Sequence, residues 1–577
     1  MQLLTNHLGY ERAGAKQAIL QAETELSLTT AELVCSQRGT PIMQLPLKAC
    51  GPVDQWHTGY TYSMDFTALD QCGEFRIRIG ETVSAPFVIA EGLLMHRTFS
   101  DVLHYFKSQR CGGKFDHADR QAPVLGSDQT IDAHGGWYDA SGDVSKYFSH
   151  LSYGNYFNPQ QIPMIVWNML MAFEQLADDD GVAKFTQVRL LEEALHGADF
   201  LQRMQSPNGF FYMTVFDKWS KDTKQREICA YATQAGVKSD DYHAGFRQGG
   251  GVAIAALAFA ARTLQQPIAN ALDFDTTAAA EYLACAERGY WHLVEMNTHY
   301  LNDGVENIID EYCALLAATD LYRTTDDARY LSETRRWAQR LAARQMSDDN
   351  MAHFWSANAD GSRPYFHAAE AGLPVISLLR YLDIEHDAAQ QQAITTIITQ
   401  ALQFELAITA EVANPFGYPR QYVKAVDGDK HSAFFVPHNN ETGYWWQGEN
   451  ARLASLASMA YLACQYRSIH TDTTALRTYA QRLMDWLLGL NPFDISMLDG
   501  HGRNNPDYLP ELGFFNARGG VCNGITSGFD NERDIAFNPQ PQAEDILQNW
   551  RWGEQWIPHA GWYLLAITLQ FKERHCD

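Results

Sequence analysis

The sequence lacks any pair of cysteines arranged as Cys-x-x-Cys, and its ten cysteines are scattered along the whole chain. This absence argues against the zinc sites and redox centres that such pairs form, and against the disulfide framework of a short secreted protein. Cys285, Cys313 and Cys464 fall in apolar helical segments, where a free cysteine behaves as a small hydrophobic side chain. We therefore predict ten reduced cysteines in a reducing compartment.

Long apolar runs and a leader segment are also lacking. No run of about 18 apolar residues occurs, so a membrane-spanning helix is not expected. The opening residues Met1–His7 contain neither the basic region nor the apolar region of a secretory signal. These absences predict a cytoplasmic protein that has no membrane partner.

Positive charge is scarce. The chain has 44 Lys and Arg against 69 Asp and Glu, which gives a formal net charge of −25. Such an excess of negative charge argues against nucleic acids and anionic membranes as partners. It is compatible with neutral or cationic substrates, and also with a surface that is charged only for solubility.

The first 90 residues carry the pattern of short β-strands. Phe75, Ile77 and Ile79 alternate with charged residues, and the segment 60–66 alternates in the same way. Glycine, proline and aspartate separate these segments. The pattern predicts a small all-β sandwich, with its last strand near 85–89.

Helical periodicity begins near residue 97. Leu453, Leu456, Ala457 and Ala460, for example, form one apolar stripe. Twelve segments have this character: 97–110, 160–179, 186–205, 247–264, 277–295, 306–323, 327–345, 366–382, 388–407, 447–466, 471–488 and 558–572. They could form a solenoid, a bundle or a toroid, because periodicity does not distinguish these arrangements. The loops between them are long at 111–158, 207–245, 409–446 and 489–557, and such loops are usually functional.

One of these loops contains the stretch Gly135–Tyr147, with the sequence GGWYDASGDVSKY. Three glycines in eight residues are unfavourable in a helix, so the stretch is predicted to form a turn that brings Asp139 and Asp143 together. Paired carboxylates beside the aromatic residues Trp137 and Tyr138 suit the activation of water next to a sugar ring. The alternative is a solvated acidic turn, for which Asp is also favoured.

This stretch resembles the signature of glycoside hydrolase family 9, Gly-Gly-Trp-x-Asp-Ala-Gly-Asp followed by Lys and an aromatic residue, with Ser141 as one extra residue. That family contains cellulases and related β-1,4-glycosidases. The resemblance implies that Asp143 is the catalytic base and that Asp139 helps to hold the attacking water. It implies no cofactor.

The candidate for the catalytic acid is Glu554. The segment Arg551–Gly561 resembles the family motif that carries the acid just before the last helix, and Glu554 stands at the glutamate position. We expect Trp552 and Trp556 to form an apolar wall that raises the pKa of this carboxyl group. The alternatives are that Glu554 is an exposed loop residue and that Glu441 or Glu532 is the acid.

Two further blocks support the resemblance. Leu487–Ser496 and Gly500–Pro506 resemble a stretch that precedes a His-His-Arg sugar-binding triplet in the cellulases, and here the triplet is replaced by Asp507–Glu511. Asn6–Tyr10 resembles the start of the immunoglobulin-like module of some family members. The resemblance thus implies a multidomain protein, with an immunoglobulin-like β-sandwich over residues 1–90 and an all-α (α/α)6 barrel over residues 91–577.

Candidate sugar contacts come from aromatic and polar loop residues, because sugars stack on aromatic rings while amides and carboxylates bind hydroxyl groups. The densest such loop is 434–450, whose aromatic residues could instead pack at the entry of the next helix. The predicted contacts are Trp137, Tyr138, Asp240, Asp241, His438, Asn439, Glu441, Tyr444, Trp445, Trp446 and Trp552.

Other chemistries have weaker support. Gly249–Gly251 opens a helix but lacks the Lys-Ser/Thr of a phosphate-binding loop. Cys111, His117, Asp119 and His134 could be considered as metal ligands, but their spacing is not that of a known site. The prediction is therefore no metal and no cofactor.

Together these features predict an inverting hydrolase of β-1,4-linked oligosaccharides, with the carboxyl groups of Asp143 and Glu554 about 6.5–9.5 Å apart. The missing triplet, the acidic charge and the expected cytoplasmic location favour the branch that resembles exo-β-glucosaminidases, which release glucosamine from short chitosan-type chains. Alternatives are an endo-β-1,4-glucanase, a cellodextrin-cleaving exoglucosidase and a non-catalytic carbohydrate-binding protein. Asp139, Asp240, Asp241 and Glu441 are the candidate partners of a substrate amine.

Overall fold

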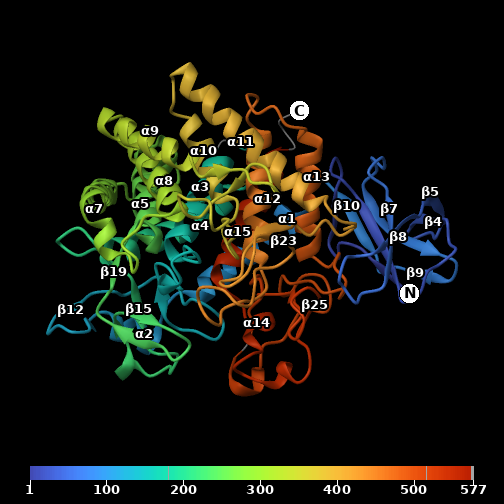
Figure 1. The fold of residues 1–577 in the computed structure, drawn as a ribbon, viewed down its shortest axis with the longest axis horizontal. Helices are drawn as coiled ribbons and strands as arrows, with labels where there is room; N and C mark the ends of the chain where they lie inside the picture. Colours follow the sequence, from blue (N-terminus) through green and yellow to red (C-terminus); the bar gives the residue numbers. More distant parts are fainter. Residues whose placement is uncertain (178, 180, 515, 574–577) are drawn as a thin grey trace.

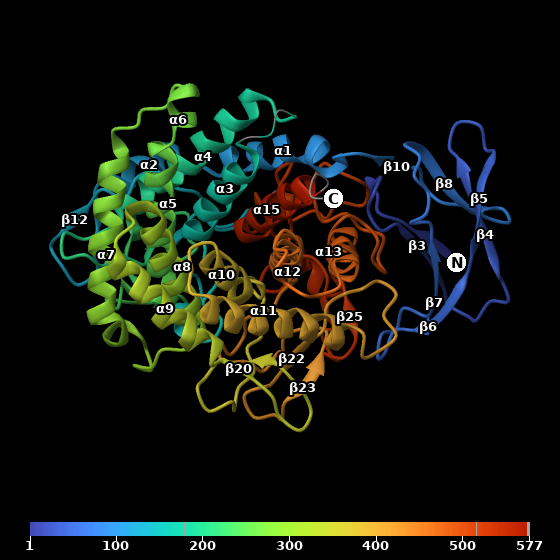
Figure 2. The same ribbon diagram turned by 90° about the horizontal axis from the view of Figure 1, so that it is seen from above.

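The computed structural model describes residues 1–177, 179, 181–514 and 516–573. A β-sheet region made by the N-terminal residues lies at one end of a larger helical region (Figures 1 and 2). The last strand of the β-region ends at Ala90 and the first helix begins at Leu93. The predicted order, an N-terminal β-region followed by a helical region, is confirmed.

The N-terminal region consists of two sheets that enclose an apolar core. One sheet has the order β1-β3-β7-β6, and the other has the order β2-β10-β8-β4-β5 with β9 paired to β8. The core between them includes Leu20, Leu33, Met64 and Ile77, and in β8 buried and less buried residues alternate as the sequence predicts. The strands are β1 (Gln2–Leu4), β2 (Gly9–Glu11), β3 (Gln17–Ala22), β4 (Thr30–Cys35), β5 (Pro41–Pro46), β6 (Lys48–Pro52), β7 (Tyr60–Asp65), β8 (Gly73–Ile79), β9 (Thr82–Val83) and β10 (Phe87–Ala90).

The segment around Gly489 of the helical region packs against this β-region. The Asn6 side chain donates to Asp485 (2.9 Å), and the His7 ring pairs with Asp494 (2.9 Å). Gly489 lies so close to the His7 ring that an added Cβ would stand 2.2 Å from it, and its φ of +112° also favours glycine. The blocks around residues 487–506 that support the family resemblance therefore include an interface between the two regions.

Six helices that are buried along most of their length form a closed ring, in which α3, α5, α8, α10, α12 and α15 each pack on the next and α15 packs on α3. Six more helices pack on the outside of this ring: α1, α4, α7, α9, α11 and α13. The bounds are α1 (Leu93–Gln109), α2 (Gly113–Asp119), α3 (Ile162–Leu176), α4 (Lys184–Arg203), α5 (Gly251–Gln265), α6 (Pro267–Ala271), α7 (Ala278–Tyr300), α8 (Ile308–Thr325), α9 (Ala328–Ala342), α10 (Leu373–Leu382), α11 (Ala388–Thr409), α12 (Asn450–Cys464), α13 (Thr473–Leu487), α14 (Trp550–Gly553) and α15 (Ile557–Glu573).

Each of the twelve predicted helices is present, while the short helices α2, α6 and α14 were not predicted. Three outer helices begin at an aspartate, namely Asp327, Asp387 and Asp472, whose side chain accepts a backbone N–H of the first turn. The helix predicted from residue 366 begins only at Leu373, because Pro374 occupies its first turn. Local signals thus determine most of the helix ends.

Most of the long loops gather at one end of the helices, below them in Figure 1, where α2, α14, β15 (Thr214–Phe216) and β25 (Ile535–Ala536) lie. The strands among these loops are two or three residues long. One of them, β13 (Lys146–Tyr147), directly follows the Asp143 turn. This end of the helical region therefore presents the candidate catalytic residues.

Nine of the ten cysteines lie in the described part of the chain, and Cys576 lies outside it. Eight of the nine are free thiols: Cys35, Cys50, Cys72, Cys111, Cys229, Cys285, Cys313 and Cys522. Among the described residues, no helix combines the length and the apolar character needed to cross a lipid bilayer.

Candidate active site

The stretch Gly135–Tyr147 forms the tight turn that the glycines predict. Ala140 and Asp143 exchange two backbone hydrogen bonds, with N–O distances of 3.2 and 3.3 Å. The Asp139 N–H donates to the carbonyl of Ser145 (3.0 Å), which closes the loop from the other side. Asp139 and Asp143 are thereby held next to each other, and both are almost completely buried.

A buried ion-pair network anchors the turn from behind. The Lys146 ammonium lies 2.7 Å from the Asp119 carboxylate and also donates to the carbonyls of Ala133 (2.5 Å) and Gly135 (2.8 Å). Arg226 binds the same carboxylate through two nitrogens, at 2.5 and 2.9 Å. Although burial opposes ionisation, these two cations keep the pKa of Asp119 below its usual value. The lysine of the signature thus has a structural role.

Asp143 accepts three hydrogen bonds. They come from the Ser145 N–H (2.8 Å), the Tyr147 hydroxyl (2.7 Å) and the Trp219 indole N–H (3.1 Å). Burial raises the pKa of Asp143, and the bonds from Ser145 and Tyr147 oppose this shift. Donors on both oxygens therefore fix the orientation of the carboxylate. A general base needs such a fixed orientation, because it must accept a proton from a water molecule at one defined position.

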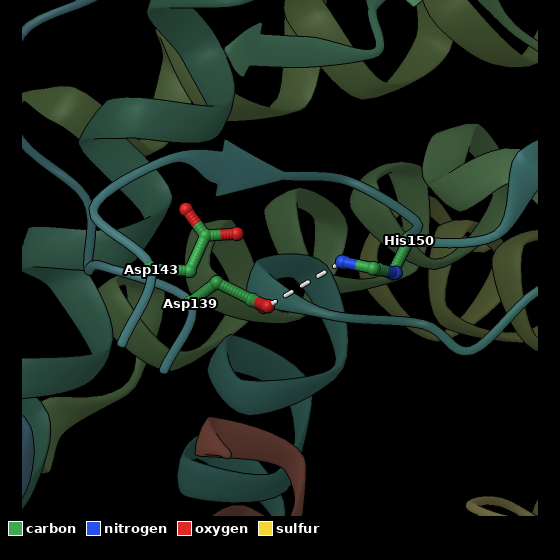
Figure 3. Close-up of side chains that lie close together, drawn as sticks. All are labelled: Asp139, Asp143 and His150. Carbon is green, nitrogen blue, oxygen red and sulfur yellow. Dashed lines mark ion pairs between the residues drawn. The ribbon is translucent and has the colours of Figure 1, made fainter. Parts of the chain in front are cut away.

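Asp139 lies beside Asp143 and points toward His150 (Figure 3). Its Oδ1 accepts from the Trp556 indole N–H (3.2 Å), and its Oδ2 lies 3.8 Å from the His150 Nε2. Burial, together with the charges of Asp143 and Glu554, raises the pKa of Asp139 well above its usual value. Burial also lowers the pKa of His150 to about 3, so this imidazole is neutral at physiological pH.

Glu554 is joined to the Asp143 turn through Ser141. The Ser141 N–H donates to the carbonyl of Gln555 (2.9 Å), and the Ser141 hydroxyl accepts the Gln555 N–H (3.0 Å). Ser141, the extra residue in the signature, thus pairs with Gln555, the residue that directly follows Glu554. An added Cβ on Gly142 would stand 2.6 Å from the Glu554 Oε1, so only glycine lets the carboxyl group approach the turn this closely.

The electrostatic environment of Glu554 suits a proton donor. Burial and the nearby negative charge of Asp143 raise the pKa of Glu554 to about 8. At pH 7 this carboxyl group is therefore mostly protonated. Among the two wall residues that we expected, Trp556 lines the same cavity, whereas Trp552 is fully buried and donates to Thr526 (2.8 Å).

These groups face a cavity of about 290 Å³. Three carboxylic acids, Asp139, Asp143 and Glu554, lie in its lining, and aromatic rings make much of the remainder. The described residues of the lining include neither Lys nor Arg. The lining consists of Asp139, Ala140, Gly142, Asp143, His150, Trp219, Gln234, Tyr444, Trp445, Gln447, Tyr508, Phe514, Ile546, Leu547, Trp550, Glu554 and Trp556.

Two of the predicted sugar contacts, Tyr444 and Trp445, line this cavity. Trp445 is nearly buried and packs edge-on against Trp556, with ring centroids 6.2 Å apart. The Tyr444 hydroxyl accepts a hydrogen bond from Tyr153 (3.0 Å). Both rings are therefore held in place by neighbouring aromatic side chains while they line the cavity.

Three other predicted aromatic contacts, Trp137, Tyr138 and Trp446, lie outside the lining of this cavity. Trp137 is fully buried and donates to Glu193 (2.7 Å), so it is a core residue. Tyr138 exchanges hydrogen bonds with the backbone of Gly112, away from the cavity. The Trp446 ring stacks on the His438 ring, with centroids 3.8 Å apart, and the Arg551 guanidinium carbon lies 4.0 Å from the Trp446 ring centroid.

The predicted polar contacts are also displaced from the cavity. Asp240, Asp241 and Asn439 are exposed and lie outside its lining. Glu441, one alternative acid, is held by Arg363 through two contacts. Glu532, the other alternative, is exposed and accepts the backbone N–H of His438 (2.9 Å). Of the three candidate acids, Glu554 is the one that lines the cavity with Asp143.

Several residues of the cavity were not predicted. His150 and Trp219 contact the two aspartates from separate loops, and Tyr508 lies beside Glu554. His150 is only seven residues after Asp143, so its position near the motif was the available signal. Trp219 and Tyr508 had no comparable signal, because they reach the site only through the tertiary fold.

Among the described residues, Asp139, Asp143 and His150 are the set whose side-chain ligand atoms lie within 4.8 Å of one another and could share a metal ion. The carboxylate oxygens of Asp139 and Asp143 already accept hydrogen bonds from indole, hydroxyl and backbone groups. The hydrolysis of a glycoside by two carboxyl groups needs no metal ion. Of the metal ligands considered in the sequence, Asp119 is neutralised by Lys146 and Arg226. The Asp119 carboxylate is thus already paired with two cationic side chains.

Comparisons with known proteins agree with this geometry. The sequence profile of Glycosyl hydrolase family 9 matches residues 96–511, which include both aspartates. The search of curated protein sequences found no match.

Solved structures show the same fold over nearly the whole chain. A metagenome-derived glycoside hydrolase family 9 endoglucanase is 18% identical with a TM-score of 0.67, and 99% of each chain is covered. A family 9 protein of Bacteroides ovatus is 17% identical with a TM-score of 0.65, again with 99% of each chain covered. AaCel9A, solved in complex with a cellobiose-like isofagomine, is 18% identical with a TM-score of 0.65, covering 99% of this chain and 100% of that chain. This chain belongs to glycosyl hydrolase family 9.

Proposed function

We propose that this glycoside hydrolase is an inverting exo-β-glucosaminidase, which releases glucosamine from short β-1,4-linked chitosan-type chains. We interpret its ring of six buried and six outer helices as an (α/α)6 barrel over residues 91–577, and its two N-terminal sheets as an immunoglobulin-like module over residues 1–90. The catalytic residues are Asp139, Asp143 and Glu554.

In this proposal Asp143 acts as the general base. It removes a proton from a water molecule that Asp139 helps to hold, and the water oxygen bonds to the anomeric carbon from the face opposite the leaving group. As the glycosidic C–O bond breaks, Glu554 gives its proton to the leaving oxygen. The donors on Asp143 and the raised pKa of Glu554 support this division of roles.

The acidic lining of the cavity, without a cationic side chain among its described residues, is the observation that carries the substrate assignment. Three carboxylic acids line it, the described lining residues include neither Lys nor Arg, and His150 is neutral. A protonated 2-amino group would gain favourable interactions here, whereas a buried ammonium group without a partner is costly. Of the amine partners predicted from the sequence, Asp139 lines the cavity and Asp240, Asp241 and Glu441 do not. We therefore infer that Asp139 contacts the amine.

The endo-β-1,4-glucanase alternative keeps one specific support, because two of the similar structures above are of an endoglucanase and of a protein bound to a cellobiose-like ligand. The cellodextrin-cleaving alternative has the same support. A non-catalytic carbohydrate-binding protein would not need a protonated acid opposite an oriented base. The cytoplasmic location is proposed on the eight free thiols among the described cysteines.

A side-by-side hydrolysis assay tests the substrate assignment. With the β-1,4 disaccharides of glucosamine, N-acetylglucosamine and glucose, we expect kcat/KM for the glucosamine disaccharide to exceed that for cellobiose by about tenfold or more, since one charge-assisted contact contributes about 1.5–3 kcal/mol. In Asp139→Asn both rates should fall, and the ratio between them should narrow toward one. Equal or faster cleavage of cellobiose by the wild-type protein, or cuts in the middle of a soluble cellulose, would support the endoglucanase alternative.

A further inference from the structure

The segment that stands in place of the cellulase triplet packs directly against the catalytic acid. Tyr508 belongs to this segment, is nearly buried and lines the cavity. A Cβ added to Gly142 would stand 3.0 Å from the Tyr508 hydroxyl and 2.6 Å from the Glu554 Oε1. The hydroxyl and the carboxyl group thus meet at the same point of the Asp143 turn.

Neighbouring groups fix the position of the Tyr508 ring. The Phe514 ring packs on it, with centroids 5.2 Å apart and planes inclined by 30°. The Tyr508 ring also lies close to the backbone of Gly553, the residue before Glu554: a Cβ added to Gly553 would stand 3.4 Å from the Tyr508 Cδ2. The Asn516 amide donates to the carbonyls of both Pro506 (3.0 Å) and Gly553 (2.8 Å), so it ties the two segments together.

We propose that Tyr508 is a positioning residue of the general acid, whose hydroxyl group donates to the Glu554 carboxyl group and keeps its proton directed into the cavity. A hydroxyl next to a carboxylate stabilises the charged form by donating to it. In agreement, the Tyr508 side chain lowers the pKa of Glu554, against the larger opposite effects of burial and of Asp143. Tyr508 therefore limits how strongly the acid holds its proton.

This role predicts the direction of a pH shift. Removing the hydroxyl in Tyr508→Phe removes a donor to the carboxylate, so the pKa of Glu554 rises further. Because the acid works only when protonated, the alkaline limb of the kcat/KM profile should move to higher pH, by about one unit. A more tightly held and less well directed proton is transferred more slowly, so kcat at pH 6 should fall about tenfold while KM changes little.

The leaving group provides a second readout. An activated aryl leaving group, such as nitrophenol, needs little proton donation, so the loss of rate in Tyr508→Phe should be small with an aryl glycoside and large with a disaccharide. Tyr466→Phe is the matched control, since the Tyr466 hydroxyl also donates to a carboxylate, Asp383 (2.8 Å), but lies outside the cavity lining. It should leave the pH profile unchanged.

The inference rests on the proposed function, and the assay separates the two. If the wild-type protein cleaves none of the β-linked substrates, the proposed function fails. If the wild-type protein is active but Tyr508→Phe has the same alkaline limb and equal losses on both leaving groups, Tyr508 does not position the acid. If circular dichroism shows that Tyr508→Phe folds poorly, Tyr508→Gln and Tyr508→Leu provide a second comparison. Gln keeps a hydrogen-bond donor, so the alkaline limb of its kcat/KM profile should lie closer to that of the wild-type protein than the limb of Tyr508→Leu does. Equal displacement of the alkaline limb in Tyr508→Gln and Tyr508→Leu would overturn the inference.

Discussion

Replacing Asp143 by Asn is expected to lower kcat on a β-linked disaccharide by about 10²–10⁴-fold, the usual contribution of a general base. The amide has the same shape but cannot remove a proton from water. Tyr147 and Trp219 would still have an oxygen to which they can donate, whereas the Ser145 N–H would lose its acceptor. The backbone hydrogen bonds between Ala140 and Asp143 do not depend on the side chain, so the turn should persist. Steady-state rates of the purified variant at saturating substrate measure this effect.

The same substitution should make the protein more stable at neutral pH. Because burial raises the pKa of Asp143 in the folded state, the folded protein holds this proton more tightly than the unfolded chain does. The free energy of unfolding therefore falls as the pH rises through the window between the unfolded and the folded pKa. Asn carries no charge and should remove this loss, which urea unfolding at pH 7 would show as a higher midpoint. Asp128→Asn is the control: this residue is exposed, and its substitution should change neither kcat nor the midpoint of urea unfolding. Nearly full activity of Asp143→Asn would exclude Asp143 as the general base.

Replacing Glu554 by Gln is expected to lower the rate on a disaccharide by about 10²–10⁴-fold, while an aryl glycoside with a good leaving group should lose much less. The reason is that the glycosidic oxygen of a disaccharide must be protonated as it leaves, whereas a nitrophenolate does not need this proton. The two substrates measured in parallel separate loss of the acid from loss of the fold.

The pH profile gives a second signature of the acid. In the wild-type protein the pKa of Glu554 is about 8, so kcat/KM should decline above pH 8 as the proton is lost. In Glu554→Gln this alkaline decline should disappear, because the amide does not titrate in this range. Equal losses on both substrates, or an unchanged alkaline limb, would mean that another group supplies the proton.

The helices and the two-carboxylate turn could be predicted from the sequence because their signals are local. A 3.6-residue repeat over fifteen or more residues is the same in any fold, and the glycines around Asp139 and Asp143 restrict the backbone where they stand. The closure of six helices into a ring could not be predicted in this way. It depends on which apolar faces meet, such as that of α15 with α3, and those helices are far apart in the chain.

The directions of side chains account for most of the errors in the site. Trp137 is two residues before Asp139, but it points into the core because Glu193 of α4 accepts its indole N–H. Glu441 has the acidic group of a candidate catalyst, yet Arg363, 78 residues away, binds it outside the cavity. In both cases a distant residue determines the role, and no local pattern in the sequence reveals that residue.

The most direct test of the account is the anomeric configuration of the sugar that is first released from a β-linked substrate. Proton NMR spectra recorded within the first minutes of hydrolysis of the glucosamine β-1,4 disaccharide distinguish the two anomers before they interconvert. A base and an acid on opposite faces of the bond, Asp143 and Glu554, predict that the newly formed reducing end appears first as the α-anomer. An initial excess of the β-anomer would show retention, and it would contradict the assignment of Asp143 as a base that activates water.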